Sequence, residues 1–464
     1  MSRSEGGPKP SGAALAPPRS FNLLEIPLFK RVVRSRWYPG ILAWPTLIVF
    51  AFITYELVMG PGKAHDNFGT ALTWVLWWPI LPIMFLFAGR IWCAICPFGT
   101  INDLVQKFVG NNRPVPRFLK KYGIWIIDAI FMLITWSDHL WGVVENPLNS
   151  GILLLLITMG VVVSGAFFER RTWCRYLCFL GGLSGNYTRG GMIGLSATPE
   201  ICATCTTQAC YKGGEKAPGC PMFVFPRTME SNADCNLCGN CVKNCPNNSI
   251  RITTRLPSEE LWFVRNPQLP VAFLASVIMG IVFVQNITML EVWNKILAWF
   301  EGSLHISYYP VAFTIAFLTL MAIPVGLLFG VSALAKRGNG RTVLENFARF
   351  GYAIIPLDMA GHIAHNLFHL LAEGKAIGFT ALGLFGKEAG GSAALVDSAT
   401  IQALQYLLVA LGMAGSLYTA WRLAKGTSSP GPKRQLTFAP LFALMVLLAV
   451  INIYLFSMPM AMRM

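Results

Sequence analysis

Charged residues are scarce in this sequence. They make up 13% of its 464 residues, whereas 54% of the residues are hydrophobic. A soluble globular domain carries about 25% charged residues. The composition therefore excludes an ordinary soluble enzyme and is typical of a protein that crosses the membrane several times. Acidic residues are the scarcer kind, 22 against 37 basic ones, which leaves a net charge of +15.

Several functional signatures are also missing. No segment resembles a DNA-binding or signalling domain, which argues against a transcriptional or redox sensor, and nothing resembles a substrate pocket with a nucleophile or general base. The basic residues lie in short loops between apolar runs. The positive-inside rule explains that pattern without a nucleic-acid partner. A cleavable signal peptide is not expected either, because the first apolar run begins near Ile41 after a polar leader.

Nine apolar runs are long enough to cross a bilayer, which takes about 20 residues. They cover residues 41–58, 71–89, 122–144, 151–168, 269–289, 310–334, 346–372, 401–423 and 437–457. Loops rich in Lys and Arg alternate with loops that are poor in them, so we expect a cytoplasmic N-terminus and an extracytoplasmic C-terminus. The predicted fold is a polytopic α-helical membrane protein of the cell inner (cytoplasmic) membrane, with about nine transmembrane helices.

Eight cysteines stand within the loop that follows the fourth run. They are Cys202, Cys205, Cys210, Cys220, Cys235, Cys238, Cys241 and Cys245. The last four have the spacing C-x2-C-x2-C-x3-C-P, which in bacterial two-cluster ferredoxins binds [4Fe–4S] clusters, with the fourth cysteine crossing to the other cluster. The first four cysteines have a similar but looser spacing. A cytoplasmic location keeps such thiols reduced and makes disulfides unexpected.

This crossing rule predicts two clusters and their ligands. One set is Cys202, Cys205, Cys210 and Cys245, and the other is Cys235, Cys238, Cys241 and Cys220. Two structural zinc sites are the alternative, since four thiolates also suit zinc. Zinc modules usually have C-x2-C pairs set well apart, so the spacing favours iron–sulfur. We also expect Gly239 to let the backbone pass close to the inorganic core.

Four further cysteines end two apolar runs. Cys93 and Cys96 follow the second run, and Cys174 and Cys178 follow the fourth. Each pair comes after an Arg-x-Trp, which suggests an internal repeat of two helical hairpins at the cytoplasmic face. These pairs are candidates for a redox dithiol or for a metal site that joins both pairs. The alternative is that they are small apolar residues buried at helix ends.

Residues 41–265, with these motifs in this order, resemble the membrane-bound polyferredoxins of the NapH, NosR and CcoG type. The resemblance implies four membrane helices, two cysteine pairs at the cytoplasmic face and a two-cluster ferredoxin domain. This chain has C-x2-C where the family has C-x3-C, and Phe179 where the second pair would be followed by proline.

The expected domains follow from these features. Residues 1–40 are a disordered, basic cytoplasmic leader, and residues 41–195 a four-helix membrane domain with both cysteine pairs. Residues 196–265 are an inserted cytoplasmic ferredoxin-like domain with two [4Fe–4S] clusters, and residues 266–464 a five-helix membrane domain.

The seventh run carries the second candidate site. Asp358, His362, His365 and His369 recur at helical spacing, which puts them on one face of a helix. Ionisable residues inside a membrane span usually line a cavity or a relay. The readings are a quinone site, haem b with His139 as the partner ligand, a metal such as copper, or a polar packing seam. His362 and His369 stand about 10 Å apart along the axis, so they do not bind one haem from both sides.

The functional hypothesis is membrane-associated electron transfer. The chain would relay electrons between a quinone pool or redox partner and a respiratory-type reductase, as an electron-transfer subunit of an oxidoreductase system with a partner subunit or soluble carrier. The alternative is an assembly or metal-handling factor that reduces a metal such as copper for a respiratory enzyme. Soft thioether ligands at Met458, Met460, Met462 and Met464 favour that alternative.

Overall fold

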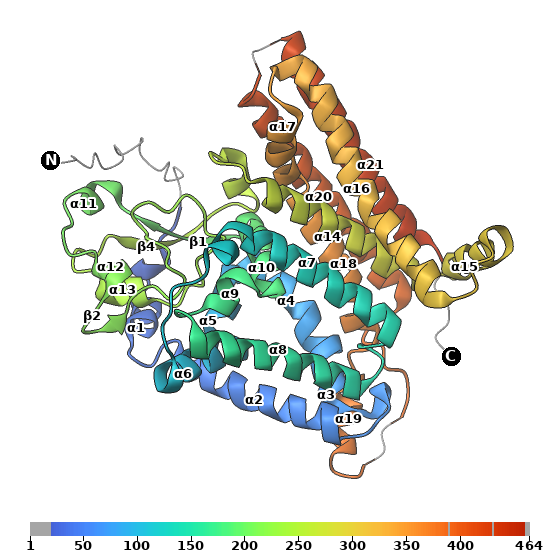
Figure 1. Ribbon diagram of the computed structural model, residues 1–464, viewed down its shortest axis with the longest axis horizontal. Coiled ribbons are helices and arrows are strands. Elements are labelled where there is room, and N and C mark those ends of the chain that lie inside the picture. Colours follow the sequence, from blue (N-terminus) through green and yellow to red (C-terminus); the bar gives the residue numbers. More distant parts are fainter. Residues whose placement is uncertain (1–19, 388–389, 429–430, 460–464) are drawn as a thin grey trace.

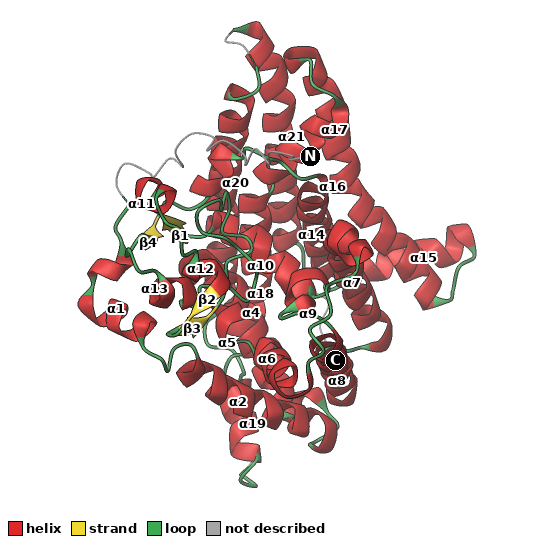
Figure 2. Cartoon of the chain, turned by 60° about the vertical axis from the view of Figure 1, so that its left-hand side comes forward, coloured by secondary structure: helices red, strands yellow, loops and turns green. Residues whose placement is uncertain are grey.

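The computed structural model describes residues 20–387, 390–428 and 431–459. It is a largely helical protein in which a small, loop-rich unit with two short sheets lies beside a body of long helices (Figures 1 and 2). Met460, Met462 and Met464 lie outside the described residues.

The front half of the helical body contains two helical hairpins. Its helices are α2 (Gly40–Met59), α3 (Phe68–Thr70), the π-helix η3 (Ala71–Trp77), α4 (Trp78–Ala88), α5 (Trp92–Ile95), α6 (Pro97–Val109), α7 (Arg117–Trp141), α8 (Pro147–Phe167), α9 (Thr172–Tyr176) and α10 (Phe179–Gly190). The helices α6, α8 and α2 pack side by side. Asn146 caps α8 by accepting hydrogen bonds from the backbone amides of Leu148 and Asn149.

The ferredoxin segment is built from short elements. They are β1 (Ile193–Ala197), α11 (Pro199–Ala203), α12 (Ala209–Lys212), β2 (Gly213–Gly214), β3 (Ala217–Pro218), α13 (Asn240–Asn244), β4 (Ile250–Thr254) and the 3-10 helix η5 (Glu259–Phe263). Strands β1 and β4 pair antiparallel, with Leu195 opposite Ile252, and so bring the two ends of the segment together. The cysteine loops lie between these strands.

The rear half of the body is a bundle of long helices. They are α14 (Leu269–Ile287), α15 (Glu291–Leu304), α16 (Tyr309–Asn339), α17 (Val343–Phe350), α18 (Ile355–Ala372), α19 (Ala376–Gly383), α20 (Ser398–Lys425) and α21 (Pro432–Ser457). Thr342 and Glu345 form a capping box that fixes the start of α17. The helix α18 packs mainly against α20, and also against α14, α4 and α10. Every residue from Ile355 to Asn366 is buried, so α18 is a central helix of the molecule.

In the described part of the chain, seven helical segments are long and apolar enough to cross a membrane. They are Gly40–Met59, Phe68–Val109, Pro147–Phe167, Leu269–Ile287, Tyr309–Asn339, Ser398–Lys425 and Pro432–Ser457. The helices α7 and α18 occupy the places of the other two expected spans. Both carry acidic side chains, Asp128 in α7 and Asp358 in α18, which lower their hydropathy. The predicted total of nine spans stays a prediction.

Part of the segment expected to be a disordered leader is folded in the structure. The helix α1 (Pro27–Arg34) and the residues around it pack onto the ferredoxin segment. Val33 is buried, the hydroxyl of Tyr38 donates a hydrogen bond to the carbonyl of Leu237 at 2.9 Å, and Lys243 donates to the carbonyl of Tyr38. The leader thus supports the loop that carries Cys235 and Cys238.

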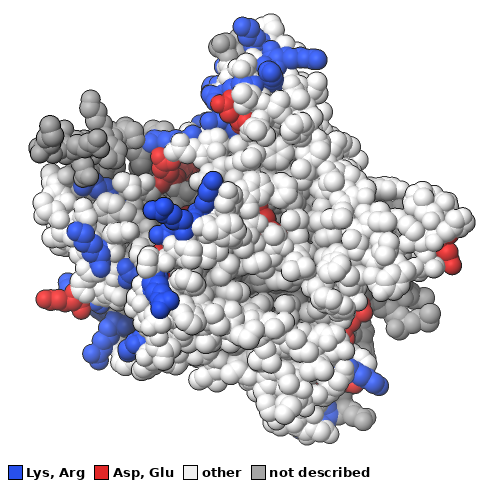
Figure 3. All heavy atoms as spheres, in the orientation of Figure 1, with Lys and Arg blue, Asp and Glu red and all other residues white. Residues whose placement is uncertain are grey.

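Charged side chains gather on two parts of the surface. Figure 3 shows Lys and Arg over the ferredoxin segment, beside it, and at the end of the bundle where α16 and α21 meet, while the rest of this face, toward the right and below, is largely uncharged. An uncharged band flanked by a basic side matches the pattern that the positive-inside rule describes.

Candidate iron–sulfur and membrane sites

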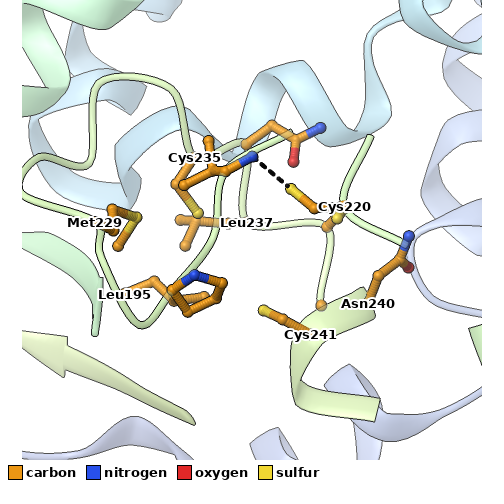
Figure 4. A pocket seen from close by; sticks show the side chains of 12 residues that line it. Leu195, Cys220, Met229, Cys235, Leu237, Asn240 and Cys241 are labelled. Atoms are coloured by element: carbon orange, nitrogen blue, oxygen red, sulfur yellow. Dashed lines mark hydrogen bonds between the residues drawn. The ribbon is translucent and has the colours of Figure 1, made fainter. Parts of the chain in front are cut away.

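Four of the ferredoxin cysteines line one pocket (Figure 4). They are Cys220, Cys235, Cys238 and Cys241, the set predicted from the crossing rule. Leu195, Met229 and Leu237 supply apolar walls. Cys241 stands in the first turn of α13, and the left-handed conformation of Gly239 (φ 76°) starts that helix. A β-carbon at Gly239 would contact Val33 at 3.0 Å, so this glycine also makes room for the leader helix.

The other four ferredoxin cysteines are also brought together. Ser249 connects two of them, because its hydroxyl lies 3.0 Å from the sulfur of Cys202 and its amide donates to the sulfur of Cys245 at 3.3 Å. The Cys210 thiol interacts electrostatically with those of Cys245, Cys202 and Cys205. This grouping is the one that the spacing predicts. Cys241, which lines the pocket of Figure 4, also interacts electrostatically with Cys210, so the two sets of cysteines are neighbours.

The two crossing cysteines have the same backbone environment. The amide of Val224 donates to the sulfur of Cys220 at 3.4 Å, and the amide of Ser249 donates to that of Cys245. In both cases the donor stands four residues after the cysteine of a Cys-Pro pair. Amide hydrogen bonds to the ligating sulfurs help to set the potential of an iron–sulfur cluster.

Burial controls the acidity of these thiols. Burial raises the pKa of Cys235 to about 12 and that of Cys238 to about 11, although an amide hydrogen bond from Asn240 lowers the latter. Burial also raises the pKa of Cys241 well above its usual value, and neighbouring thiols add to the effect. Cluster ligation needs thiolates, and the positive charge of bound iron offsets this penalty.

The donor set fits an iron–sulfur cluster better than a single ion. Each group supplies four thiols, and the pocket of the Cys220 set is lined largely by apolar residues, with the amide of Val224 donating to the Cys220 sulfur. Among the described residues, no three His, Cys, Asp or Glu side chains converge closely enough to hold one metal ion. Four thiols around the rim of a pocket match a cube with several irons, since each iron takes its own thiolate.

A partly buried carboxylate holds the loop in front of Cys235. Glu260 accepts hydrogen bonds from the Ser231 hydroxyl, at 2.5 Å, and from the Asn232 amide, at 3.1 Å, and pairs with Arg255 at 2.5 Å. Burial alone would raise the pKa of Glu260. Arg255 and Arg189 outweigh that effect, so the pKa lies below its usual value. No feature of the sequence identified this contact.

The two membrane-side cysteine pairs occupy equivalent turns. We call residues 89–99 the first cysteine turn and residues 170–181 the second. Cys93 lies in α5 and Cys174 in α9, whereas Cys96 and Cys178 are the residues that precede α6 and α10. All four are free cysteines. The predicted repeat is therefore visible in the backbone of both turns.

The structure places His362 apart from His365 and His369, whose rings lie edge-to-face with centroids 5.3 Å apart. His362 is buried, and its Nδ1 lies 2.9 Å from the hydroxyl of Tyr187 in α10. Asp358 is fully buried, and neither of its carboxyl oxygens has a hydrogen-bond partner among the described residues. His365 faces another way and contacts Asn286 at 3.1 Å, while His369 lies 3.6 Å from Glu373.

His139, the expected partner ligand for haem b, is held by contacts with other protein groups. Its ring stacks on Phe313 with centroids 4.9 Å apart. Both ring nitrogens are engaged, one with the carbonyl of Thr135 at 3.1 Å and the other with the hydroxyl of Thr288 at 3.2 Å. Haem ligation by His139 would have to break one of these contacts.

A cavity of about 290 Å³ opens beside His365. It lies between the C-terminal ends of α14 and α21, the start of α20 and the middle of α18, at the end of α14 opposite its connection to the ferredoxin segment. Asn286, Gln402 and Gln405 add polar groups, and Leu290, Ile401, Leu455 and Phe456 add apolar ones. A mostly apolar cavity with a few polar groups is typical of a small-molecule site. The sequence pattern pointed to His365 but not to the glutamines.

Comparison with known proteins identifies part of the chain. Residues 70–116 and 151–193 match the family model of a 4Fe-4S binding domain. These two stretches contain all four membrane-side cysteines, and they end before the eight cysteines of the ferredoxin segment. No solved structure matches the chain significantly.

Two curated proteins of Escherichia coli (strain K12) are similar to the chain. YccM, which is named for electron transport, is 23% identical over 235 residues, or 45% of this chain and 61% of that protein. The ferredoxin-type protein NapH is 25% identical over 206 residues, or 39% of this chain and 67% of that protein. The resemblance to membrane-bound polyferredoxins is thus confirmed for part of the chain, which carries a 4Fe-4S binding domain among helices apolar enough to cross a membrane.

Proposed function

We propose that this chain is an electron-transfer protein of the cell inner membrane that carries two [4Fe–4S] clusters on its cytoplasmic side. Cys202, Cys205, Cys210 and Cys245 hold one cluster, and Cys220, Cys235, Cys238 and Cys241 hold the other. The observation that carries the proposal is the pocket lined by the second set. When bound, such clusters supply one-electron redox chemistry.

The orientation is supported by charge. Basic residues gather over the ferredoxin segment and at the common end of α16 and α21 (Figure 3), and positive residues favour the cytoplasmic side. The ferredoxin segment and the N-terminus then lie in the cytoplasm, and the cavity beside His365 lies near the outer side with the C-terminus. One similar protein is named for electron transport and the other is named ferredoxin-type. Both names agree with a carrier that works with a redox partner.

We further propose that the cavity beside His365 takes the head group of a quinone. Its volume is close to the lower end of the range of small-molecule sites, about 300 Å³. Quinol oxidation releases two electrons and two protons, so a site needs a group that can accept a proton near the ring oxygen. The imidazole of His365, oriented by Asn286, can do this within the cavity. Asp358 and His362 lie deeper, against Tyr187, and do not line it.

The test is quinone-linked redox kinetics in lipid nanodiscs. Protein reduced with dithionite and freed of excess reductant is mixed with a short-chain quinone, and return of the visible absorption is followed. His365→Leu should slow this return by about tenfold or more, because proton transfer by a positioned side chain contributes about 10²–10⁴. His65→Leu, whose side chain is 74% exposed and outside the cavity lining, is the control. Equal rates for wild type and His365→Leu would contradict the proposal that this cavity is a quinone site.

One observation favours the second candidate, a metal-handling factor. Met289 and Met458 line the same cavity as His365. Thioether and imidazole groups together suit Cu(I). Under this reading, Met289→Leu with Met458→Leu lowers Cu(I) affinity in competition with a chelator and leaves the quinone kinetics unchanged. If the Met289→Leu, Met458→Leu variant instead slows the reaction with quinone and binds Cu(I) as the wild type does, the result favours the electron carrier.

A further inference from the structure

Asp358, Tyr187 and His362 form a buried polar group inside the helical body. We propose that these three side chains are a proton-binding site, which takes up one proton from water when an iron–sulfur centre of the chain gains one electron. The inference rests on the proposed iron–sulfur function and adds a proton to the electron transfer. It does not depend on the quinone cavity.

The carboxyl group of Asp358 is the first observation. Asp358 is fully buried in α18, and neither of its carboxyl oxygens has a hydrogen-bond partner among the described residues. Buried polar groups without partners are rare in native proteins, because each costs the desolvation free energy of that group. An apolar side chain would fill the same space without this cost. Ionisable residues inside a membrane protein typically belong to ion pathways or proton relays.

A tyrosine and a histidine in contact with each other lie beside this carboxyl group. The hydroxyl of Tyr187 lies 2.9 Å from Nδ1 of His362, and Asp358 interacts electrostatically with Tyr187. Asp358 and His362 are four residues apart in α18, so they lie on the same face of the helix. Carboxyl, phenol and imidazole groups are the ones that proteins use to accept and donate protons. The three side chains therefore have the chemistry of a proton site.

The elements around the site contribute little charge. The elements α14, α4 and η3 pack against α18 and contain no charged residue. Besides Tyr187, α10 carries Arg189, which lies 3.9 Å from Glu260 and over the ring of Tyr352 in η6. The Lys and Arg residues of α20 and α21 stand near the ends that residues 426–431 connect. At their contacts with α18, α20 and α21 present neutral polar side chains, namely Gln405, Ser416 and Asn452.

The helix α10 brings the site close to the cysteines. One turn before Tyr187, the hydroxyl of Ser184 lies 3.8 Å from the sulfur of Cys93. A β-carbon at Gly185 would stand 3.5 Å from the carbonyl of Ala233, in the loop that leads to the ferredoxin pocket. The same short helix thus contacts a membrane-side cysteine, the ferredoxin segment and the proton site.

Low polarity explains why an electron and a proton are coupled here. The effective dielectric constant inside a protein is about 4–20, so a charge acts more strongly there than in water. An electron on a nearby centre adds one negative charge, and a proton bound at the site balances it. A one-electron reductant loses the electron, and a hydronium ion in the aqueous phase gives up the proton. The only new bond is one O–H or N–H bond within the site.

The first test is a redox titration of the purified protein without oxygen, at a series of pH values, followed by visible absorption. In the wild type, the midpoint potential of one centre should fall, over part of the series, by about 59 mV for each tenfold decrease in proton concentration, the value for one proton per electron. Asp358→Asn keeps the size of the side chain but does not bind the proton, so this dependence should disappear.

Asp128 in α7 provides the matched control. It is 1% exposed, and its carboxyl oxygens also lack hydrogen-bond partners among the described residues. Asp128→Asn should therefore keep the pH dependence of the wild type, although it removes an equally buried carboxyl group. A wild-type dependence in Asp358→Asn, or its loss in Asp128→Asn alone, would overturn the assignment to the Asp358 site.

The second test needs no variant, so it remains decisive if Asp358→Asn does not fold. Infrared difference spectra between the reduced and oxidised wild type should contain a carboxylic acid carbonyl band that shifts in heavy water. Protein grown with isotope-labelled aspartate should show a further shift of this band. A difference spectrum without an aspartate carboxyl band would contradict the proposal.

These measurements separate the proton site from the function on which it rests. A wild-type protein that contains no iron and does not bleach with dithionite would overturn both the electron carrier and the proton site. Normal bleaching, with a midpoint potential that is independent of pH at every centre, would leave the carrier in place and overturn the proton site alone.

Discussion

The guanidinium of Arg171 lies against Gly99, a residue of the other cysteine turn. Arg90 lies against Gly181 in the same way. This reciprocal arrangement connects two stretches about 80 residues apart in the sequence, and it explains why Arg-x-Trp-Cys occurs twice. In this repeat, the arginine of each cysteine turn packs against the glycine of the other turn.

Gly99→Ala should therefore destabilise the protein. The new methyl group has to displace the buried Arg171 side chain, and overpacking of this kind costs about 1–3 kcal/mol. The measurement is thermal unfolding in detergent, with iron content as a second readout. Gly330→Ala in α16, where nothing lies within 4 Å of the added carbon, is the control and should be neutral or slightly stabilising. Equal melting temperatures for the two variants would contradict the crossed arrangement.

The leader helix gives a second prediction. Val33→Asp puts a carboxylate into the contact with Gly239 and should cost about 3 kcal/mol or more, because the charge is buried without a partner. Val32, its neighbour, is 45% exposed, so Val32→Asp should change little. Limited proteolysis of the loop before Cys235 reports the difference. Similar protease resistance in both variants would mean that the leader does not support this loop.

The Glu260 contact predicts a pH dependence. The folded pKa of Glu260 is below its ordinary value, so its stabilising contribution is present above the unfolded pKa, near 4.5, and is lost as pH falls through the folded value. Glu260→Gln should cost about 1–3 kcal/mol at pH 7, since Arg255 loses its carboxylate partner and keeps only its hydrogen bonds to the carbonyls of Gly191 and Thr188.

Thermal unfolding from pH 7 to pH 3 measures this effect. The difference between wild type and Glu260→Gln should shrink toward the acid end, while Glu259→Gln should behave as wild type throughout. A difference that stays constant over the whole range would show that the carboxylate charge is not the cause.

The hydrogen bond between Tyr187 and His362 gives a further prediction. Both side chains are buried, so Tyr187→Phe leaves a histidine nitrogen without its partner and should cost about 1–3 kcal/mol. Tyr454→Phe, at an exposed site in α21, is the control. Thermal unfolding measures the stability of both variants. An equal effect of both would show that the buried hydrogen bond contributes little to stability.

Cysteine spacing is enough to propose the ferredoxin site, because its expected ligands are local in sequence. Three of four thiols in each set stand within ten residues, and the fourth is specified by a Cys-Pro pair, so the pocket lined by Cys220, Cys235, Cys238 and Cys241 follows from the sequence pattern. Hydrophobic runs predicted the long helices for the same reason, since length and apolar content are local properties.

Features that depend on tertiary packing could not be predicted. The docking of Val33 and Tyr38, the Glu260 contact and the approach of Tyr187 to His362 each join residues more than 25 positions apart. The helical spacing of the histidines correctly placed them on one helix, but α18 is surrounded on several sides, so His362 and His365 face different neighbours. Net hydropathy could not decide whether α7 and α18 cross the membrane, because buried carboxylates lower it in both helices and three histidines lower it further in α18.

The measurement that tests the central claim most directly is metal analysis of the purified protein with an absorption spectrum before and after dithionite. The account predicts iron with an equal amount of acid-labile sulfide and a broad visible band that bleaches on reduction. It also predicts a large loss of both in Cys241→Ala, whose thiol is in the pocket of Figure 4. Zinc without iron, or unchanged iron in Cys241→Ala, would contradict the assignment of this chain as an iron–sulfur electron carrier.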